Sequence, residues 1–261
     1  MKTKAAVLVS VIALAASPVL AQSPFDGTWV LNQQKSDFTG TTMTIEDAGN
    51  GAVRFVNPNF SHTVKSDGTK AETPGGETVA IQKRSETSYH ETTWRDGKEL
   101  SQADWTLSNG DKTLTIHEYG IRPDGEKFDD TATYTRLSGT GGLVGAWKTS
   151  AVKLGNPTTY RISIGAGDVM TWDLPAIKGT WKGKLDGSDV RAMGPTVPET
   201  LTLAVTRQGP RALSMTQKLQ GKTVYTATYT VSDDGKTMTV VGKNAKGETS
   251  KQVWERQGNG Q

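Results

Sequence analysis

Apolar and polar residues alternate along most of this chain with the period of two that is typical of β-strands. The clearest run is 224–231, where apolar side chains alternate with Thr226, Thr228 and Thr230. Asn-Gly and Asp-Gly turns, which adopt positive φ readily, recur along the chain. The pattern predicts an all-β fold of antiparallel β-barrels or closed sandwiches. A short helix is expected only near Ser150 to Leu154.

The chain also repeats itself. Gly27-Thr28-Trp29 opens one series of strands and Gly145-Ala146-Trp147 opens a second. The two series close on Tyr134-Thr135-Arg136 and on Trp254-Glu255-Arg256, so that Trp and Arg lie 107 and 109 residues apart. This agreement predicts two copies of one structural unit.

Turns and apolar faces coincide when the two copies are superposed. A shift of 124 residues places Trp105 on Tyr229, and a shift of 119 places Ile45 on Ile164. The change of shift is explained by loops of different length.

The repeats predict the division of the chain. We expect a first lipocalin-like β repeat at 22–138 and a second at 143–257. The small residues of 139–142 predict a linker, and 258–261 a tail. Each copy is long enough for a core of its own.

The beginning of the chain has the three parts of a secretory signal peptide at 1–21. Lys2 and Lys4 precede an apolar run, and the small residues that end at Ala21 predict cleavage there. The chain contains no Cys, so neither disulfides nor thiolate metal sites are possible. We expect a periplasmic or secreted protein without an integral membrane span after cleavage.

Charge divides the two copies. Residues 22–140 hold 12 basic and 18 acidic side chains, net −6, whereas 141–261 hold 16 basic and 9 acidic, net +7. These fields could hold the halves together, or they could be dispersed surface charge, which we favour. No basic run is interleaved with aromatic residues, so a nucleic-acid partner is not expected.

Gly-x-Trp on an opening strand with Arg on a closing strand resembles the lipocalin and wider calycin pattern. The opening residues 25–32 also resemble a class of exported bacterial lipocalin-like proteins of uncertain function. The resemblance implies up-and-down barrels with one end closed by Trp under an Arg guanidinium. The six signature residues are Gly27, Trp29, Arg136, Gly145, Trp147 and Arg256. Within each copy, Trp29 would meet Arg136 and Trp147 would meet Arg256. These residues are expected to specify the fold and to contact no ligand.

Candidate site residues come from positions where the copies differ in polarity. The apolar face Leu213, Met215, Gln217 and Leu219 of the second copy corresponds to Tyr89, Glu91, Thr93 and Arg95 of the first. In the same way, Trp181 corresponds to His62. If this face points inward, His62, Tyr89, Glu91 and Arg95 are ligand-binding candidates, because buried ionisable groups are costly unless they are paired or functional. A register shifted by one residue would instead turn Ser88, His90, Thr92 and Trp94 inward.

The sequence favours a binding protein over an enzyme. No catalytic motif, phosphate loop or dinucleotide fingerprint is present. The histidines lack the spacing of a metal site, so no metal and no cofactor is expected. We predict an exported protein that binds a small amphipathic or hydrophobic ligand in its first barrel. The alternatives are a structural or interaction module of the cell envelope and, third, a small-barrel enzyme using Glu91, Arg95 and His62.

Overall fold

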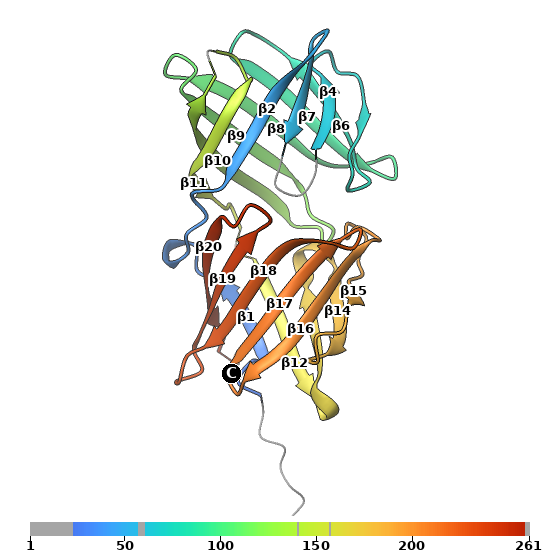
Figure 1. Ribbon diagram of the computed structural model, residues 1–261, viewed down its shortest axis with the longest axis vertical. Helices are drawn as coiled ribbons and strands as arrows, with labels where there is room; N and C mark the ends of the chain where they lie inside the picture. Colours follow the sequence, from blue (N-terminus) through green and yellow to red (C-terminus); the bar gives the residue numbers. More distant parts are fainter. Residues whose placement is uncertain (1–22, 57–60, 140, 157, 259–261) are drawn as a thin grey trace, which may run out of the picture.

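A computed structural model describes residues 23–56, 61–139, 141–156 and 158–258. The predicted signal peptide and the end of the tail lie outside these ranges. The described chain forms two antiparallel ten-stranded sheets, and each curls into a nearly closed barrel. The barrels lie end to end along the long axis of the molecule (Figure 1). The predicted all-β fold of two barrels is confirmed.

The first barrel has the strand order β4 (Ser61–Lys65), β3 (Ala52–Val56), β2 (Thr42–Gly49), β11 (Gly145–Lys153), β10 (Lys127–Ser138), β9 (Thr113–Ile121), β8 (Lys98–Ser108), β7 (Ser88–Arg95), β6 (Thr78–Lys83) and β5 (Ala71–Glu72). The second barrel has the order β14 (Gly179–Lys184), β13 (Val169–Leu174), β12 (Thr159–Gly165), β1 (Gly27–Leu31), β20 (Thr249–Arg256), β19 (Thr237–Asn244), β18 (Lys222–Val231), β17 (Ala212–Leu219), β16 (Leu201–Gly209) and β15 (Val190–Arg191).

The helical segments among the described residues are three short 3-10 turns, η1 (Gln33–Lys35), η2 (Ala166–Asp168) and η3 (Pro175–Ile177). The helix expected near Ser150 to Leu154 is wrong, because β11 runs through Lys153 and its backbone pairs with β10. In that strand the hydrogen bonds of the sheet outweigh local helix preference. Neither the turns nor any other described helix is long and apolar enough to cross a bilayer.

The opening strands of the two repeats have changed places. β1 pairs with β12 and β20 of the second barrel, while β11 pairs with β10 and β2 of the first. Figure 1 shows the blue β1 in the lower barrel and β11 in the upper one. The first barrel is therefore built from the continuous stretch 42–153, and the second from 27–31 together with 159–256. The sheets divide the chain differently from the sequence repeats.

This exchange corrects the predicted Trp–Arg pairs. The Arg136 guanidinium lies over Trp147 at 4.1 Å from the ring centroid, and Arg256 lies over Trp29 at 4.3 Å. The cation–π contact is the one that the resemblance implies, but each Trp meets the Arg of the other repeat. The reason is the strand exchange, which places each Trp directly opposite that Arg in the sheet.

Each Arg also closes its end of a barrel through hydrogen bonds to backbone carbonyls. Arg136 donates from Nε to the Asp111 carbonyl at 2.6 Å and from Nη1 to the Val144 carbonyl at 2.7 Å. Gly145 makes room for this guanidinium. Its φ is 146°, and a Cβ there would lie 2.8 Å from Arg136 Nη1 and 2.2 Å from the Ser138 carbonyl oxygen. Only glycine combines this φ with so close an approach.

The strand pairing also fixes how the repeats superpose. Ile45 pairs with Gly145 and Ile162 with Gly27, so Ile45 corresponds to Ile162 and not to Ile164. The expected shift of 119 is wrong there by two residues. It becomes correct after η3, since His62 and Trp181 occupy equivalent places in the next strands. The 3-10 turn supplies the two extra residues.

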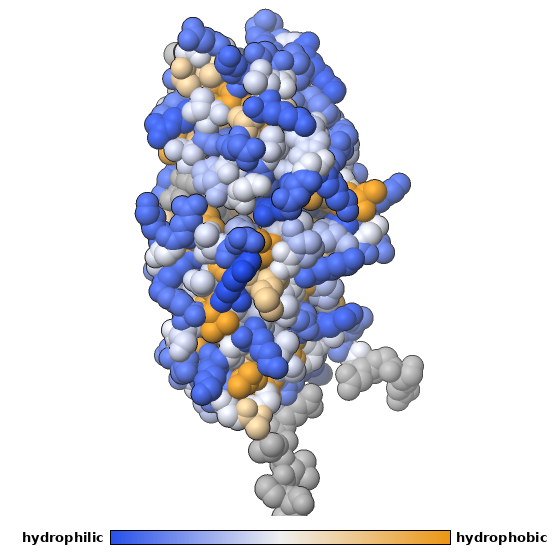
Figure 2. All heavy atoms as spheres, turned by 90° about the vertical axis from the view of Figure 1, so that its right-hand side faces the viewer, coloured by the Kyte–Doolittle hydropathy of each residue, from blue (hydrophilic) through white to orange (hydrophobic). Residues whose placement is uncertain are grey.

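The surface is largely hydrophilic. Figure 2 shows one face of the molecule with apolar side chains dispersed among polar ones. The exposed large hydrophobic residues of the described chain are Ile121, Leu137, Met193 and Val241. Apolar side chains gather instead into one cluster inside each barrel.

Candidate functional site

A cavity of about 470 Å³ lies inside the first barrel. Its size falls in the range of small-molecule sites. The lining side chains that bear on the site are Phe55, His62, Glu77, Glu91, Thr93, Ala103, Trp105, Glu118, Asp130, Ala132 and Tyr134. Val152 and Leu154, from the end of β11 and just beyond it, complete the wall, so the exchanged segment is part of this site.

Glu91 lies in the wall of the cavity on β7, flanked by Ile81 and Ala103 on the neighbouring strands. Thr93 Oγ1 donates a hydrogen bond to Glu91 Oε1 at 3.3 Å. Burial, together with the nearby charge of Glu118, raises the pKa of Glu91 to about 7. The carboxyl therefore exchanges its proton near neutral pH.

Glu118 is the second carboxyl of the wall. It lies on β9, directly opposite Ala103 and hence one strand beyond that residue from Glu91. Burial raises the pKa of Glu118, and the charges of Asp130 and Glu77 add to the rise. Asp130, on β10, accepts a hydrogen bond from the Gly155 backbone N–H at 2.9 Å. Acidic groups thus lie on β7, β9 and β10, which belong to one side of the barrel.

The predicted inward face of β7 is the one that the structure shows. Tyr89 is buried in the core and Glu91 reaches the cavity. His90 belongs to the opposite face, where its Nδ1 lies 2.8 Å from Asp104 Oδ1. The alternative register is therefore excluded.

The four candidate residues do not all meet at the cavity. Glu91 and His62 line it, whereas Tyr89 packs into the apolar cluster and Arg95 forms an ion pair with Glu77, with Nη2 2.6 Å from Oε1. Arg95 thus pairs with Glu77 and not with Glu91, although both residues belong to β7. Burial lowers the pKa of His62, although the charge of Glu77 opposes the change. The imidazole is thus a weaker base than an exposed histidine.

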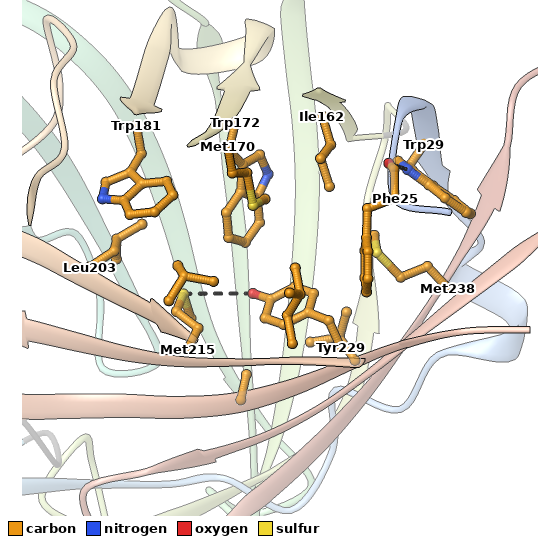
Figure 3. Packing of buried hydrophobic residues seen from close by; sticks show 14 of the residues in the cluster. Phe25, Trp29, Ile162, Met170, Trp172, Trp181, Leu203, Met215, Tyr229 and Met238 are labelled. Atoms are coloured by element: carbon orange, nitrogen blue, oxygen red, sulfur yellow. Dashed lines mark hydrogen bonds between the residues drawn. The ribbon is translucent and has the colours of Figure 1, made fainter. Parts of the chain in front are cut away.

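Side chains fill most of the second barrel. Its cluster contains Trp29, Trp172, Trp181 and Tyr229, and Figure 3 shows these side chains spread across the interior of the barrel. The Tyr229 hydroxyl reaches Met215 Sδ at 3.8 Å. A smaller cavity of about 270 Å³ remains, lined mainly by apolar and aromatic residues.

Equivalent positions of the two barrels can be read from the sheets. One row of paired residues across the wall of the first barrel is Ile81, Glu91, Ala103 and Glu118. The same row in the second barrel is Val205, Met215, Ala227 and Gly242. The Tyr225 hydroxyl fills the space beside Gly242, because a Cβ there would lie 1.7 Å from it. The second barrel thus replaces both carboxyls by apolar or small residues and closes the space.

The first cavity opens toward the junction of the barrels. A surface hollow lined by Glu77, Glu118 and Asp130 is also lined by Ile177 and Thr196 of the second barrel. Ile177 lines the cavity of the second barrel as well. The Trp–Arg pairs close the other end of each barrel, so the two open ends face each other.

Glu77, Glu118, Asp130, Trp105 and Tyr134 were missed as site residues by the sequence comparison. A signal for Glu118 was present, because it continues the alternation of Leu114 and Ile116 and corresponds to Gly242 at the shift of 124. Glu77 likewise corresponds to Leu201 at that shift. The candidate residues came from β7 and from His62 on β4, whereas the wall also includes residues of β8, β9 and β10.

Within the described residues, no group of three or more His, Asp or Glu side chains is arranged to hold a metal ion. Comparison with known proteins adds little. No family model and no curated protein matches the sequence. Among solved structures, a protein of unknown function from the DUF3598 family of Nostoc punctiforme PCC 73102 is similar over 90% of this chain and 97% of its own. The sequence identity is 12% and the TM-score 0.23, so nothing about the site is inferred from it.

Proposed function

We propose that this chain is an exported lipocalin-like protein that binds a small amphipathic molecule inside its first barrel. The observation that carries the proposal is the difference between the two interiors. The first barrel keeps a cavity of about 470 Å³ with carboxyls and aromatic rings in its wall, whereas the second is largely filled by Trp and Tyr. A barrel that needs only to be stable would be filled in both copies.

The cavity suits an amphipathic ligand because its wall has two kinds of surface. Phe55 and Trp105, in edge-to-face contact at 5.6 Å between ring centroids, offer apolar area. Glu91 and Glu118 offer polar groups that a bound molecule could satisfy. A few polar groups in a mostly apolar concave site orient a ligand.

The test is extraction of the mature protein, purified from an exporting host, followed by mass spectrometry and by titration with amphipathic fluorescent probes. Ala132→Leu reduces the first cavity, whereas Gln217→Leu changes the wall of the second. We expect Ala132→Leu to weaken binding about tenfold or more, since it occupies the space of the ligand, and Gln217→Leu to leave it unchanged. If no molecule is extracted and no probe binds at millimolar concentration, the proposal is wrong and the interaction module becomes the better hypothesis.

A second candidate is an enzyme. The observation in its favour is Glu91, whose pKa of about 7 lies where a general acid or base works best. The same extraction separates the two hypotheses. A binding protein returns an added ligand unchanged in mass after prolonged incubation, whereas an enzyme returns a product that disappears with Glu91→Gln.

A further inference from the structure

We propose that the first barrel selects small organic cations, with an amine or quaternary ammonium group held among Glu77, Glu91, Glu118 and Asp130. This inference rests on the proposed function and specifies the chemistry of its ligand. It follows from the charges of the wall, from its aromatic rings and from the contrast with the second barrel.

Charge is the first step. Four carboxyl side chains line the cavity, and among the described lining residues none is Lys or Arg. Arg95 binds Glu77, so it balances at most one of the four. His62 adds little positive charge at neutral pH, because burial lowers its pKa. Buried carboxylates are costly without a cationic partner, and a cationic ligand would supply that partner.

The aromatic rings are the second step. Phe55, Trp105 and Tyr134 line the same cavity as the carboxyls. Rings placed beside carboxylates form the environment that recognises organic ammonium groups, since the ring faces attract positive charge. The indole Nε1 of Trp105 is buried and donates no hydrogen bond within the described structure, although Trp105 is only 6% exposed. An unpartnered donor in the wall indicates a place for an acceptor atom of a ligand or for water.

The third argument is the comparison with the second barrel, because that barrel shows which residues the fold itself requires. Met215 replaces Glu91 and Gly242 replaces Glu118 at equivalent strand positions. Leu201 corresponds to Glu77, just before β6, at the shift of 124 residues. A barrel with the same framework therefore forms without these carboxyls. Their presence in the first barrel is an addition to the fold.

The groups around Glu91 couple cation binding to protons. Glu91 lines the cavity together with Glu118 on β9, Glu77 before β6, His62 on β4, and Asp130 and Tyr134 on β10. A ligand with a permanent positive charge would favour the ionised form of Glu91 and displace its proton. The affinity for such a ligand should therefore rise as the pH rises through the pKa of Glu91, about 7, and then level off.

The experiment is calorimetric titration of the full mature chain with matched probes at pH 8. Two tails, octyl and phenylethyl, each carry an amine, a hydroxyl or a carboxylate. Wild type is compared with Glu91→Gln, with the Glu91→Gln/Glu118→Gln double variant, and with Glu86→Gln. Glu86 is an exposed carboxyl of the same barrel, so the last variant changes the net charge equally without touching the cavity. Circular dichroism checks that each variant folds.

We expect the amines to bind at least about tenfold more tightly than the alcohols, since hydrogen bonds to charged groups are stronger than those between neutral groups. Glu91→Gln should reduce the preference about tenfold, and the double variant should abolish it. Glu86→Gln should preserve it. For octyltrimethylammonium, Glu91→Gln should also remove most of the rise in affinity between pH 6 and pH 8.

The outcomes separate the two proposals. Equal binding of amines and alcohols would leave the ligand-binding function standing and overturn the selection of cations. The same holds if Glu91→Gln/Glu118→Gln keeps the preference. If no probe binds the wild-type chain at millimolar concentration, both proposals are wrong.

Discussion

Two kinds of residue can be distinguished by comparing the two barrels: those that occur in both and those that occur in one. The first kind is the Trp–Arg pair, Trp147 with Arg136 in the first barrel and Trp29 with Arg256 in the second, which closes one end of each barrel through a ring contact and backbone hydrogen bonds. Glu91 and Glu118 occur in one barrel only and face its cavity. The Trp–Arg pair occurs in both barrels because the fold requires it. Glu91 and Glu118 occur in one barrel only, because the fold forms without them.

Glu91 leads to a prediction about stability and pH. Its pKa is raised from an ordinary value of 4.5 to about 7 in the folded protein. Between these values the folded chain binds more protons than the unfolded chain, so the free energy of unfolding falls as the pH rises and levels off above about 7. Glu91→Gln removes this fall. Chemical denaturation at pH 5 and pH 8 should show the variant gaining about 2 kcal/mol on the wild type over that interval, less than the full shift implies because the side chain borders a cavity.

The control for this measurement is Glu86→Gln, because Glu86 is an exposed carboxyl in the same barrel. It should follow the wild-type curve at both pH values. Parallel curves for Glu91→Gln and wild type would show that Glu91 titrates like an exposed carboxyl.

At the scale of elements, the distance between strands along the chain explains why β11, and not β1, pairs with β10. β11 begins seven residues after the end of β10, and the two strands pair directly. Pairing β10 with β1 would instead close a loop of more than a hundred residues, and long loops cost more entropy to close. β11, which is closer to β10 along the chain, therefore occupies the position beside β10 in the first barrel. β1 completes the second.

This competition explains what the sequence could and could not predict. Alternation and turns are local, so strands, faces and the repeat of Trp105 at Tyr229 followed from them. Which of β1 and β11 pairs with β10 could not be predicted in this way, because both strands carry the same Gly-x-Trp pattern and either can occupy that position in the sheet. The cavity wall was predicted at Glu91, where one strand sufficed, and missed at Glu118, where several strands had to be placed together.

The strand exchange predicts which barrel is destabilised when one of the two Trp residues is substituted. Trp29→Phe leaves a void beside Arg256 in the second barrel, although Trp29 belongs to the first repeat. Hydrogen exchange measured by mass spectrometry should quicken in β12, β19 and β20. Trp147→Phe is the matched variant and should quicken exchange in β2 and β10 of the first barrel. If Trp29→Phe instead loosens β10, the strands are not exchanged in solution.

At the scale of the whole molecule, the barrels meet through their open ends. The two segments that cross the junction hydrogen-bond to each other: Gln33 Nε2 donates to the Val152 carbonyl at 3.0 Å, and the Leu154 N–H donates to Gln33 Oε1 at 3.1 Å. Thr42, at the start of β2, also donates its backbone N–H to Glu248 of the second barrel at 3.1 Å. The second barrel thereby shapes the mouth of the first.

A substitution of Ile177 tests whether ligands enter through the junction of the barrels. Ile177 belongs to the second barrel and lines the mouth of the first cavity. Ile177→Trp should narrow the mouth and slow association of a cationic probe about tenfold, while the preference for amines over alcohols stays unchanged. Stopped-flow fluorescence measures the rate. Leu137→Trp adds a ring to the exposed Leu137, next to Arg136 at the closed end, and should leave the rate unchanged. Equal rates in all three proteins would show that ligands reach the cavity by another route.

The continuous stretch 42–153 gives the molecule a second description: it is a domain insertion. One barrel, permuted so that its Gly-x-Trp strand comes last, sits in the connection between the first two strands of the other. During synthesis the inserted barrel can close as soon as β11 has emerged, while β1 waits for partners made more than a hundred residues later. The stretch that builds the barrel with the larger cavity is thus complete before most strands of the other barrel have been made. The host barrel contains both the first and the last strand of the described chain, and the contact between Trp29 and Arg256 joins these two strands.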